Sequence, residues 1–221
     1  MQSAVYMRKP TAQQSITSAQ VVAYSISDDV EIQLRQILFG ILKRYGCTDL
    51  MAPIYTSIKE LVINAIKANF KNIYFEDYAP KNSSNDIIKY EKALELFKHE
   101  ISRENSNYFE KLARREDIKA VIDLWTDEKI LHVKVANPVT MTDTELHNVN
   151  KKLVDAENCK DLADYCIKNL DDPYREGAGL GLILIMMMLK SLQAPKDSLV
   201  ITAEPRRTTA YLKIPLVNDH S

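Results

Sequence analysis

The chain is short of glycine, of cysteine and of long apolar runs, and each shortage excludes a class of protein. Its 221 residues include five glycines and three cysteines. The cysteines, Cys47, Cys159 and Cys166, are widely spaced and fit neither a disulfide framework nor a zinc site, so we expect thiols in a reducing cytosol. The longest apolar run, 180–189, is too short to span a bilayer, and the N-terminus lacks the apolar core of a signal peptide.

An excess of charge of one sign is also missing. The chain has 29 Lys and Arg residues against 30 Asp and Glu residues, so it lacks the basic surface that nucleic-acid binding requires. The length fits one domain with an insertion. We predict a single domain over 21–216 with a helical insertion at about 87–116, a loose N-terminal tail at 1–20 and a frayed tail at 217–221.

The few glycines are concentrated in one place. Three of the five, Gly177, Gly179 and Gly181, stand at every second position just before the apolar run. Glycine is costly to order, so such a cluster indicates positive φ angles or the close approach of another group. A glycine turn that leads into a helix exposes N–H groups that bind phosphate. The alternative is a tight loop before a core helix.

A second informative stretch is 54–70, where apolar residues recur at helical spacing. Glu60, Asn64 and Lys67 follow one another at steps of four and three residues, so they share one face of the expected helix. A carboxylate, an amide and an ammonium in one row suit a metal-bound phosphate. The alternative is an ordinary solvated helix face.

The remaining pattern predicts an α+β fold. We expect a two-layer sandwich whose mixed, mostly antiparallel sheet is covered by helices on one face. Expected strands are 21–27, 72–78, 118–125, 129–136, 199–203 and 209–216, and expected helices are 30–46 (capped by Asp28 or Asp29), 54–70, 87–116 in two pieces, 142–155, 160–169 and 182–191. The segment 87–116 includes His99-Glu100, which lacks the proline of a phosphoacceptor box and favours a solvated histidine.

Two of these segments together resemble a known family. The run 60–68 (ELVINAIKA) is similar to the N box of the GHKL ATPases, which include sensor histidine kinases, chaperones, type II topoisomerases and anti-sigma kinases. The run 176–182 (EGAGLGL) resembles their second glycine box in its histidine-kinase form. Thr208-Thr209 resembles the threonine that precedes the last strand. The boxes occur in the family's order, and the resemblance covers 21–216.

The chain departs from the family at the position of the first glycine box, which is degenerate here. Aligning 133–135 with the strand before that box puts Ala136 where the family has the aspartate that binds the adenine amino group. Neither glycine follows. The adenine contact is then missing unless Asn137 replaces it, and we expect ATP and GTP to differ in affinity by less than about tenfold.

The resemblance implies a cytosolic ATP-binding signalling module. Asn64 would hold Mg²⁺, and phosphate oxygens would meet Lys67 and the backbone of Gly177, Gly179, Leu180 and Gly181. Asn137 and Thr209 would complete the nucleotide site. Glu60 would be the catalytic residue, orienting an acceptor or a water.

If the chain is active, it is an ATP-dependent protein kinase that phosphorylates histidine or serine of a separate signalling protein. The alternatives are a non-catalytic regulator that kept the ATPase fold for binding proteins, and an ATP hydrolase. Membrane and nucleic acid are not expected as partners, and homodimerisation stays open. The apolar residues of the insertion exceed what a solvated helix needs, which favours a partner-binding role for part of it.

Overall fold

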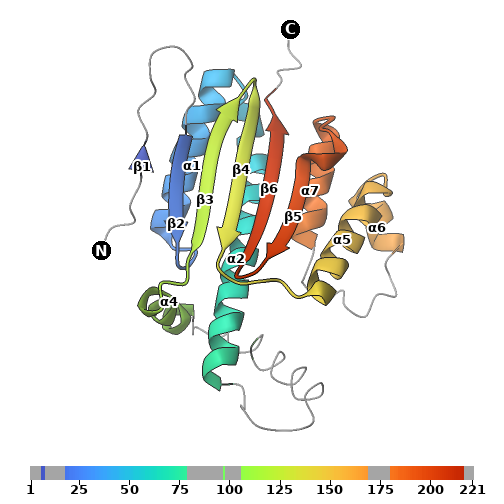
Figure 1. Cartoon of the computed structure of the whole chain (residues 1–221). Coiled ribbons are helices and arrows are strands. Elements are labelled where there is room, and N and C mark those ends of the chain that lie inside the picture. The colour runs from blue at the N-terminus through green and yellow to red at the C-terminus, as the bar shows by residue number, and fades with distance from the viewer. Residues whose placement is uncertain (1–5, 8–17, 79–96, 98–105, 169–179, 217–221) are drawn as a thin grey trace.

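The structure is a computed structural model that describes residues 6–7, 18–78, 97, 106–168 and 180–216 (Figure 1). Six strands form one sheet in the order β1-β2-β3-β4-β6-β5, and each neighbouring pair is antiparallel. The strands are β1 (Tyr6–Met7), β2 (Ser18–Ala23), β3 (Ala120–Asp127), β4 (Ile130–Asn137), β5 (Leu199–Glu204) and β6 (Arg207–Pro215).

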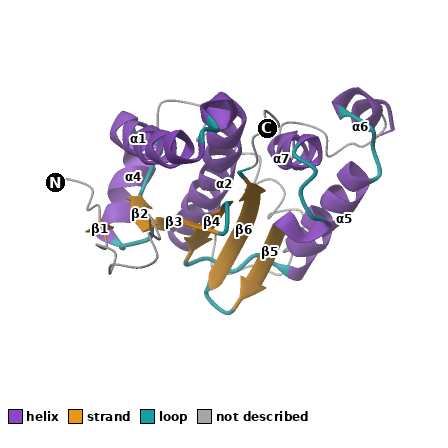
Figure 2. Cartoon of the chain, turned by 90° about the horizontal axis from the view of Figure 1, so that it is seen from above, coloured by secondary structure: helices purple, strands orange, loops and turns teal. Residues whose placement is uncertain are grey.

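Helices pack on one face of this sheet, which confirms the predicted α+β sandwich. Viewed from above, α1 (Asp28–Tyr45), α2 (Met51–Tyr78) and α7 (Leu180–Ser191) lie on the same side of the strands (Figure 2). The helices α5 (Asp143–Glu157) and α6 (Leu162–Lys168) continue this layer beyond β5. Below the β3 end of the sheet lies α4 (Ser106–Arg115), and two short 3-10 turns, η1 (Thr48–Leu50) and η2 (Lys196–Ser198), complete the described elements.

The ends of α1 follow from its sequence. Ser27 is the N-cap residue and its hydroxyl accepts a hydrogen bond from the Val30 N–H, so the expectation of a cap at Asp28 or Asp29 was wrong by one position. Both aspartates lie in the first turn instead, where their charge favours the helix dipole. Gly46 ends the helix with φ of 70°, a left-handed conformation that glycine adopts without strain.

The helix α2 is longer than expected. The predicted strand at 72–78 was wrong, because these residues continue the helix to Tyr78. Ile73 is buried, and the Tyr74 ring lies 5.4 Å from the ring of Phe97. One turn earlier, the Phe70 ring stacks on Phe109 of α4 at 5.5 Å. Burial against aromatic side chains from the predicted insertion therefore overrides the strand propensity of this segment.

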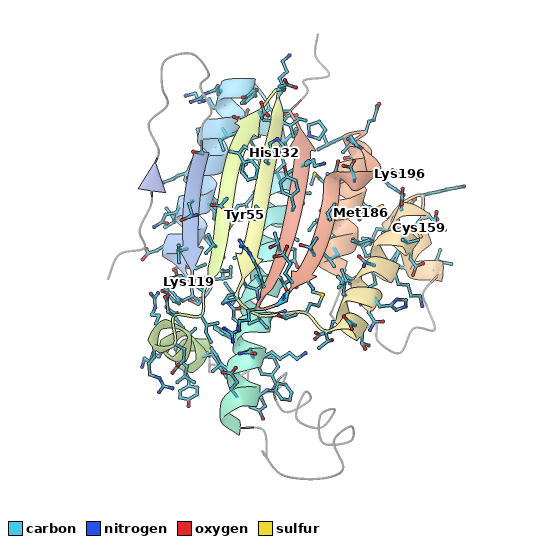
Figure 3. All side chains as sticks on the ribbon, in the orientation of Figure 1. Tyr55, Lys119, His132, Cys159, Met186 and Lys196 are labelled. Carbon is cyan, nitrogen blue, oxygen red and sulfur yellow. The ribbon has the colours of Figure 1, made fainter. Side chains whose placement is uncertain are left out.

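In the described part of the chain, helices cover one face of the sheet and not the other (Figure 2). Along β4, side chains point alternately toward these two faces. Leu131, Val133 and Val135 point toward the helices and are buried. His132 lies on the opposite face, toward the viewer in Figure 3, and stacks on Trp125 of β3 at 5.0 Å. Among the described residues no helix covers that face (Figure 2). The buried core is therefore confined to the helix side.

Much of the predicted insertion at 87–116, including His99-Glu100, lies outside the described residues. Its described part packs on the domain itself, because Phe97, Phe109 and Leu112 are buried. All three cysteines carry thiols rather than disulfides, as expected. Within the described ranges, none of the helices combines the length and the apolar composition that crossing a bilayer would require.

We predict that Phe109→Ala lowers the free energy of unfolding by about 3–5 kcal/mol, because it removes a buried ring from the contact between α4 and α2. The neighbouring Tyr108 is 45% exposed, so Tyr108→Ala is the matched control and should cost less than about 1 kcal/mol. Urea denaturation followed by circular dichroism measures both values. Equal losses would show that α4 is not anchored through Phe109.

Candidate functional site

A pocket of about 500 Å³ lies among α2, α5 and the ends of β4 and β6. This volume falls within the range of small-molecule sites. Its wall combines apolar side chains with amides, hydroxyls, two lysines and one carboxylate. The lining residues are Leu61, Asn64, Ala65, Ala68, Lys71, Asn72, Phe75, Val135, Asn137, Val139, Thr140, Met141, Thr142, Glu145, Asn148, Val149, Lys152, Leu182, Ile201, Thr208 and Ala210.

The helix α2 brings only part of its predicted row to this pocket. Asn64 lines it, while Lys67 is exposed and does not. The lysine that α2 contributes to the wall is Lys71, one turn later, whose side chain is 24% exposed. Steps of four and three residues place Asn64, Ala68 and Lys71 on one face, and Lys67 is turned aside from it. The cation that α2 contributes to the pocket is thus a lysine that the sequence pattern did not single out.

Glu60 lies next to the start of α7, outside the lining of the pocket. A Cβ atom added at Gly181 would stand 2.2 Å from Glu60 Oε2 and 2.8 Å from its Cδ, so the missing side chain of Gly181 is what lets Glu60 pack there. Gly181 is a helical residue, and among the described glycines positive φ occurs at Gly46. Close approach, one of the two predicted uses of these glycines, is therefore the one seen at Gly181.

The other glycines of the motif, Gly177 and Gly179, lie outside the described residues. Leu180 is described as the exposed first residue of α7 and is not part of the pocket wall. Leu182, two residues later, does line the pocket. The helix α7 therefore contributes an apolar contact to this wall, and a role for the glycine amides in phosphate binding stays a prediction.

The end of β4 brings Asn137, rather than Ala136, to the pocket. Asn137 lines the pocket and is 5% exposed, whereas Ala136 follows the alternation of the strand and belongs to the opposite face with His132. The position that can meet a ligand is therefore 137, and no side chain at 136 would do so. The period of two in Val133, Val135 and Asn137 is the signal that could have identified the right position.

Asn137 is held in place by a second buried amide. Its Nδ2 donates to Asn69 Oδ1 of α2 over 3.0 Å, an orientation assigned from the hydrogen-bond pattern. This bond leaves Asn137 Oδ1 to accept a hydrogen bond from a bound group. Asn69 is 1% exposed, and among the described residues its Nδ2 has no hydrogen-bond partner. Unpaired buried polar atoms are uncommon, so this pair marks a buried polar spot at the edge of the pocket.

On β6 the pocket is lined by Thr208 and Ala210. The predicted Thr209 lies between them and pairs with Ala136, so its side chain belongs to the other face of the sheet. Thr208 Oγ1 donates to Val139 O at 2.7 Å and accepts from Met141 N at 3.0 Å. The threonine in the pocket wall therefore fastens the connection from β4 to α5.

A salt bridge crosses the pocket from α2 to α5. Lys71 Nζ lies 2.5 Å from Glu145 Oε1, and Glu145 also forms a capping box with Thr142 at the start of α5. Burial alone would raise the pKa of Glu145, but hydrogen bonds from Lys71 and Thr142 outweigh it and hold that pKa below its usual value. Sequence reasoning missed Glu145, although Thr142-x-x-Glu145 is a capping-box signal.

Comparisons with known proteins identify one relative among curated proteins and no family. An uncharacterised protein of Treponema pallidum (strain Nichols) is 31% identical over 198 residues, which cover 88% of this chain and 37% of that protein. The chain thus spans little more than a third of that relative's length. No family model and no solved structure matches the chain.

The contact between Glu60 and Gly181 gives a prediction about stability. In a Glu60→Ala background, Gly181→Ala should raise the free energy of unfolding by about 0.5–1 kcal/mol, because alanine favours helix over glycine. With Glu60 present, the same substitution should gain less, because the added methyl displaces the carboxylate. Urea denaturation of the four proteins measures this difference. The same gain in both backgrounds would contradict the close approach.

Proposed function

We propose that the pocket between α2, α5 and the ends of β4 and β6 binds a magnesium nucleotide, and that the chain is a cytosolic ATP-binding signalling module of the histidine-kinase type. The observation that carries this proposal is the meeting of Asn64 and Asn137 at one pocket, although they lie far apart in the sequence. In the GHKL resemblance the first belongs to the N box, and the second follows the strand of the first glycine box.

The chemistry of the wall supports a ligand with an apolar flat part and an anionic part. Leu61, Ala65, Val135 and Ile201 offer apolar contacts to a base, and Lys71 offers a cation for phosphate. The amide oxygen of Asn64 is a ligand type that Mg²⁺ accepts when phosphate oxygens and waters fill its other positions. Across the described residues, His, Cys, Asp and Glu do not gather in groups of three, so a metal held by protein carboxylates alone is not the proposal.

Phosphate transfer to a separate acceptor protein is part of the same proposal, with Glu60 as the residue that orients the acceptor. The alternative is a non-catalytic regulator that binds proteins. Two observations favour it: Glu60 is absent from the pocket lining and is packed at Gly181, and the family's aspartate is missing from the end of β4. ATP hydrolysis is the third candidate and would also need Glu60 near the ligand. Measuring Mg·ATP binding and turnover separates these candidates.

We predict that Asn64→Ala abolishes the magnesium-dependent part of nucleotide binding. Asn64 is exposed and lines the pocket, so its truncation should leave the fold intact. The affinity for ATP should fall at least about tenfold in the presence of Mg²⁺, as expected for a lost bond to a charged group. Isothermal titration with and without EDTA provides the internal control. If Mg·ATP affinity is unchanged in the folded variant, Asn64 is only a helix-surface residue.

We also predict that Asn137 reads the base through its Oδ1 atom. ATP should bind more tightly than ITP by up to about tenfold, because the adenine amino group can donate to Oδ1 and the oxygen of hypoxanthine cannot. Asn137→Ala should remove this preference. Asn137→Asp should increase it, since bonds to a carboxylate are stronger and Asn69 can turn its amide to donate to the new side chain.

Competition of ATP and ITP against a fluorescent nucleotide measures these preferences. Lys67→Ala serves as the control, because Lys67 is exposed and outside the pocket lining. An unchanged ratio of ATP to ITP affinity in both Asn137 variants would show that the base lies elsewhere in the pocket.

A further inference from the structure

The salt bridge between Lys71 and Glu145 lies in the pocket wall itself. Both residues line the pocket, one from α2 and the other from α5. The distance between Lys71 Nζ and Glu145 Oε1 is 2.5 Å, and the two side chains are 24% and 39% exposed. The pair therefore occupies a surface that a ligand would touch.

Glu145 is held in this position by its other oxygen. Glu145 Oε2 accepts hydrogen bonds from Thr142 N and Thr142 Oγ1, each at 2.9 Å, while Thr142 Oγ1 accepts from Glu145 N at 3.3 Å. This capping box fixes the side chain and turns Oε1 toward Lys71. The carboxylate is therefore presented to the lysine at little additional cost in side-chain entropy.

Glu145 is also the single carboxylate among the residues that line the pocket in the described part of the chain. The same wall holds two lysines, Lys71 and Lys152. An anionic ligand is attracted by the lysines and repelled by Glu145, and it needs the same ammonium group that Glu145 already binds. Charges this close interact strongly because the pocket is partly shielded from water.

We propose that Glu145 is an intramolecular competitor of the ligand's polyphosphate for Lys71. This inference rests on the proposed nucleotide-binding function of the same pocket. A phosphate oxygen takes over the Lys71 ammonium, and Glu145 keeps its capping bonds to Thr142. Glu145 thereby lowers the affinity for ligands that carry phosphate and leaves the affinity for ligands without phosphate unchanged, so it narrows the difference in affinity between ATP and adenosine.

The test uses Glu145→Gln, which removes the charge and preserves the capping box, since glutamine also serves at this position. Titration of the full chain should show the affinity for Mg·ATP rising about threefold to fivefold, the range of a partly buried ion pair. The affinity for adenosine, which has no phosphate, should stay the same. In a Lys71→Met background, Glu145→Gln should no longer raise the affinity for Mg·ATP.

Asp143→Asn is the matched control. Asp143 lies in the same first turn of α5, carries the same charge and is exposed outside the pocket lining. Removing the charge of Asp143 should leave the affinity for Mg·ATP nearly unchanged. This result would separate the effect of the contact with Lys71 from the effect of negative charge anywhere in the first turn of α5. A rise equal to that of Glu145→Gln would overturn the inference, as would an equal gain for adenosine.

Failure of this inference is distinguishable from failure of the proposed function. If Mg·ATP binds and Glu145→Gln leaves its affinity unchanged, Glu145 is not a competitor and the nucleotide site stands. If neither the folded wild-type chain nor any folded variant binds Mg·ATP or adenosine at millimolar concentration, the proposed function fails and the inference fails with it. Circular dichroism and thermal unfolding confirm that each variant is folded.

Discussion

The packing of α2 against the sheet is the contact on which the rest of the structure depends. Its face toward the core is apolar over more than three turns, with Ile54, Ile58, Leu61, Val62 and Ile66 all buried. Burying each such side chain contributes about 1.5–3 kcal/mol. The same helix contacts β4, α4 and α7. Because its apolar face is fixed in this way, its polar edge is also fixed, and Asn64 and Lys71 necessarily stand beside the end of β4.

The fold was largely predictable because its signals are periodic. Apolar residues at helical spacing predicted α1 and α2, and the β-rich runs 118–125 and 129–136 predicted the hairpin of β3 and β4. The failure at 72–78 has a physical cause. Ile73, Tyr74 and Phe75 favour a strand by propensity, but they continue the helix, in which the ring of Tyr74 lies near the rings of Phe97 and Phe109, far away in the sequence.

The site was less predictable because most of it is made by contacts that no local pattern reveals. Asn64 lines the pocket, whereas Glu60 and Lys67, which helical spacing placed on the same face, do not. Lys71 and Glu145 were missed, because a salt bridge between residues so distant in the sequence leaves no periodic signal. Asn137, the possible substitute for the family's aspartate, lines the pocket, whereas Ala136 lies on the opposite face of the sheet. Following the alternation of β4 to the end of the strand would have distinguished the two positions.

The two ends of α5 are held by opposite charges, and this explains why the helix forms a wall of the pocket. Glu145 lies in its first turn, and at its other end Lys190 of α7 donates to the carbonyl oxygens of Ala156, Glu157 and Cys159. An acidic first turn and a cation at the last carbonyls both favour the helix dipole. A ligand that took Lys71 from Glu145 would break the link to α2 and leave the link to α7 intact. Binding of such a ligand would then free the start of α5 from α2 while its far end stays attached to α7, so the proposed competition for Lys71 predicts that the position of this helix depends on the charge of the ligand.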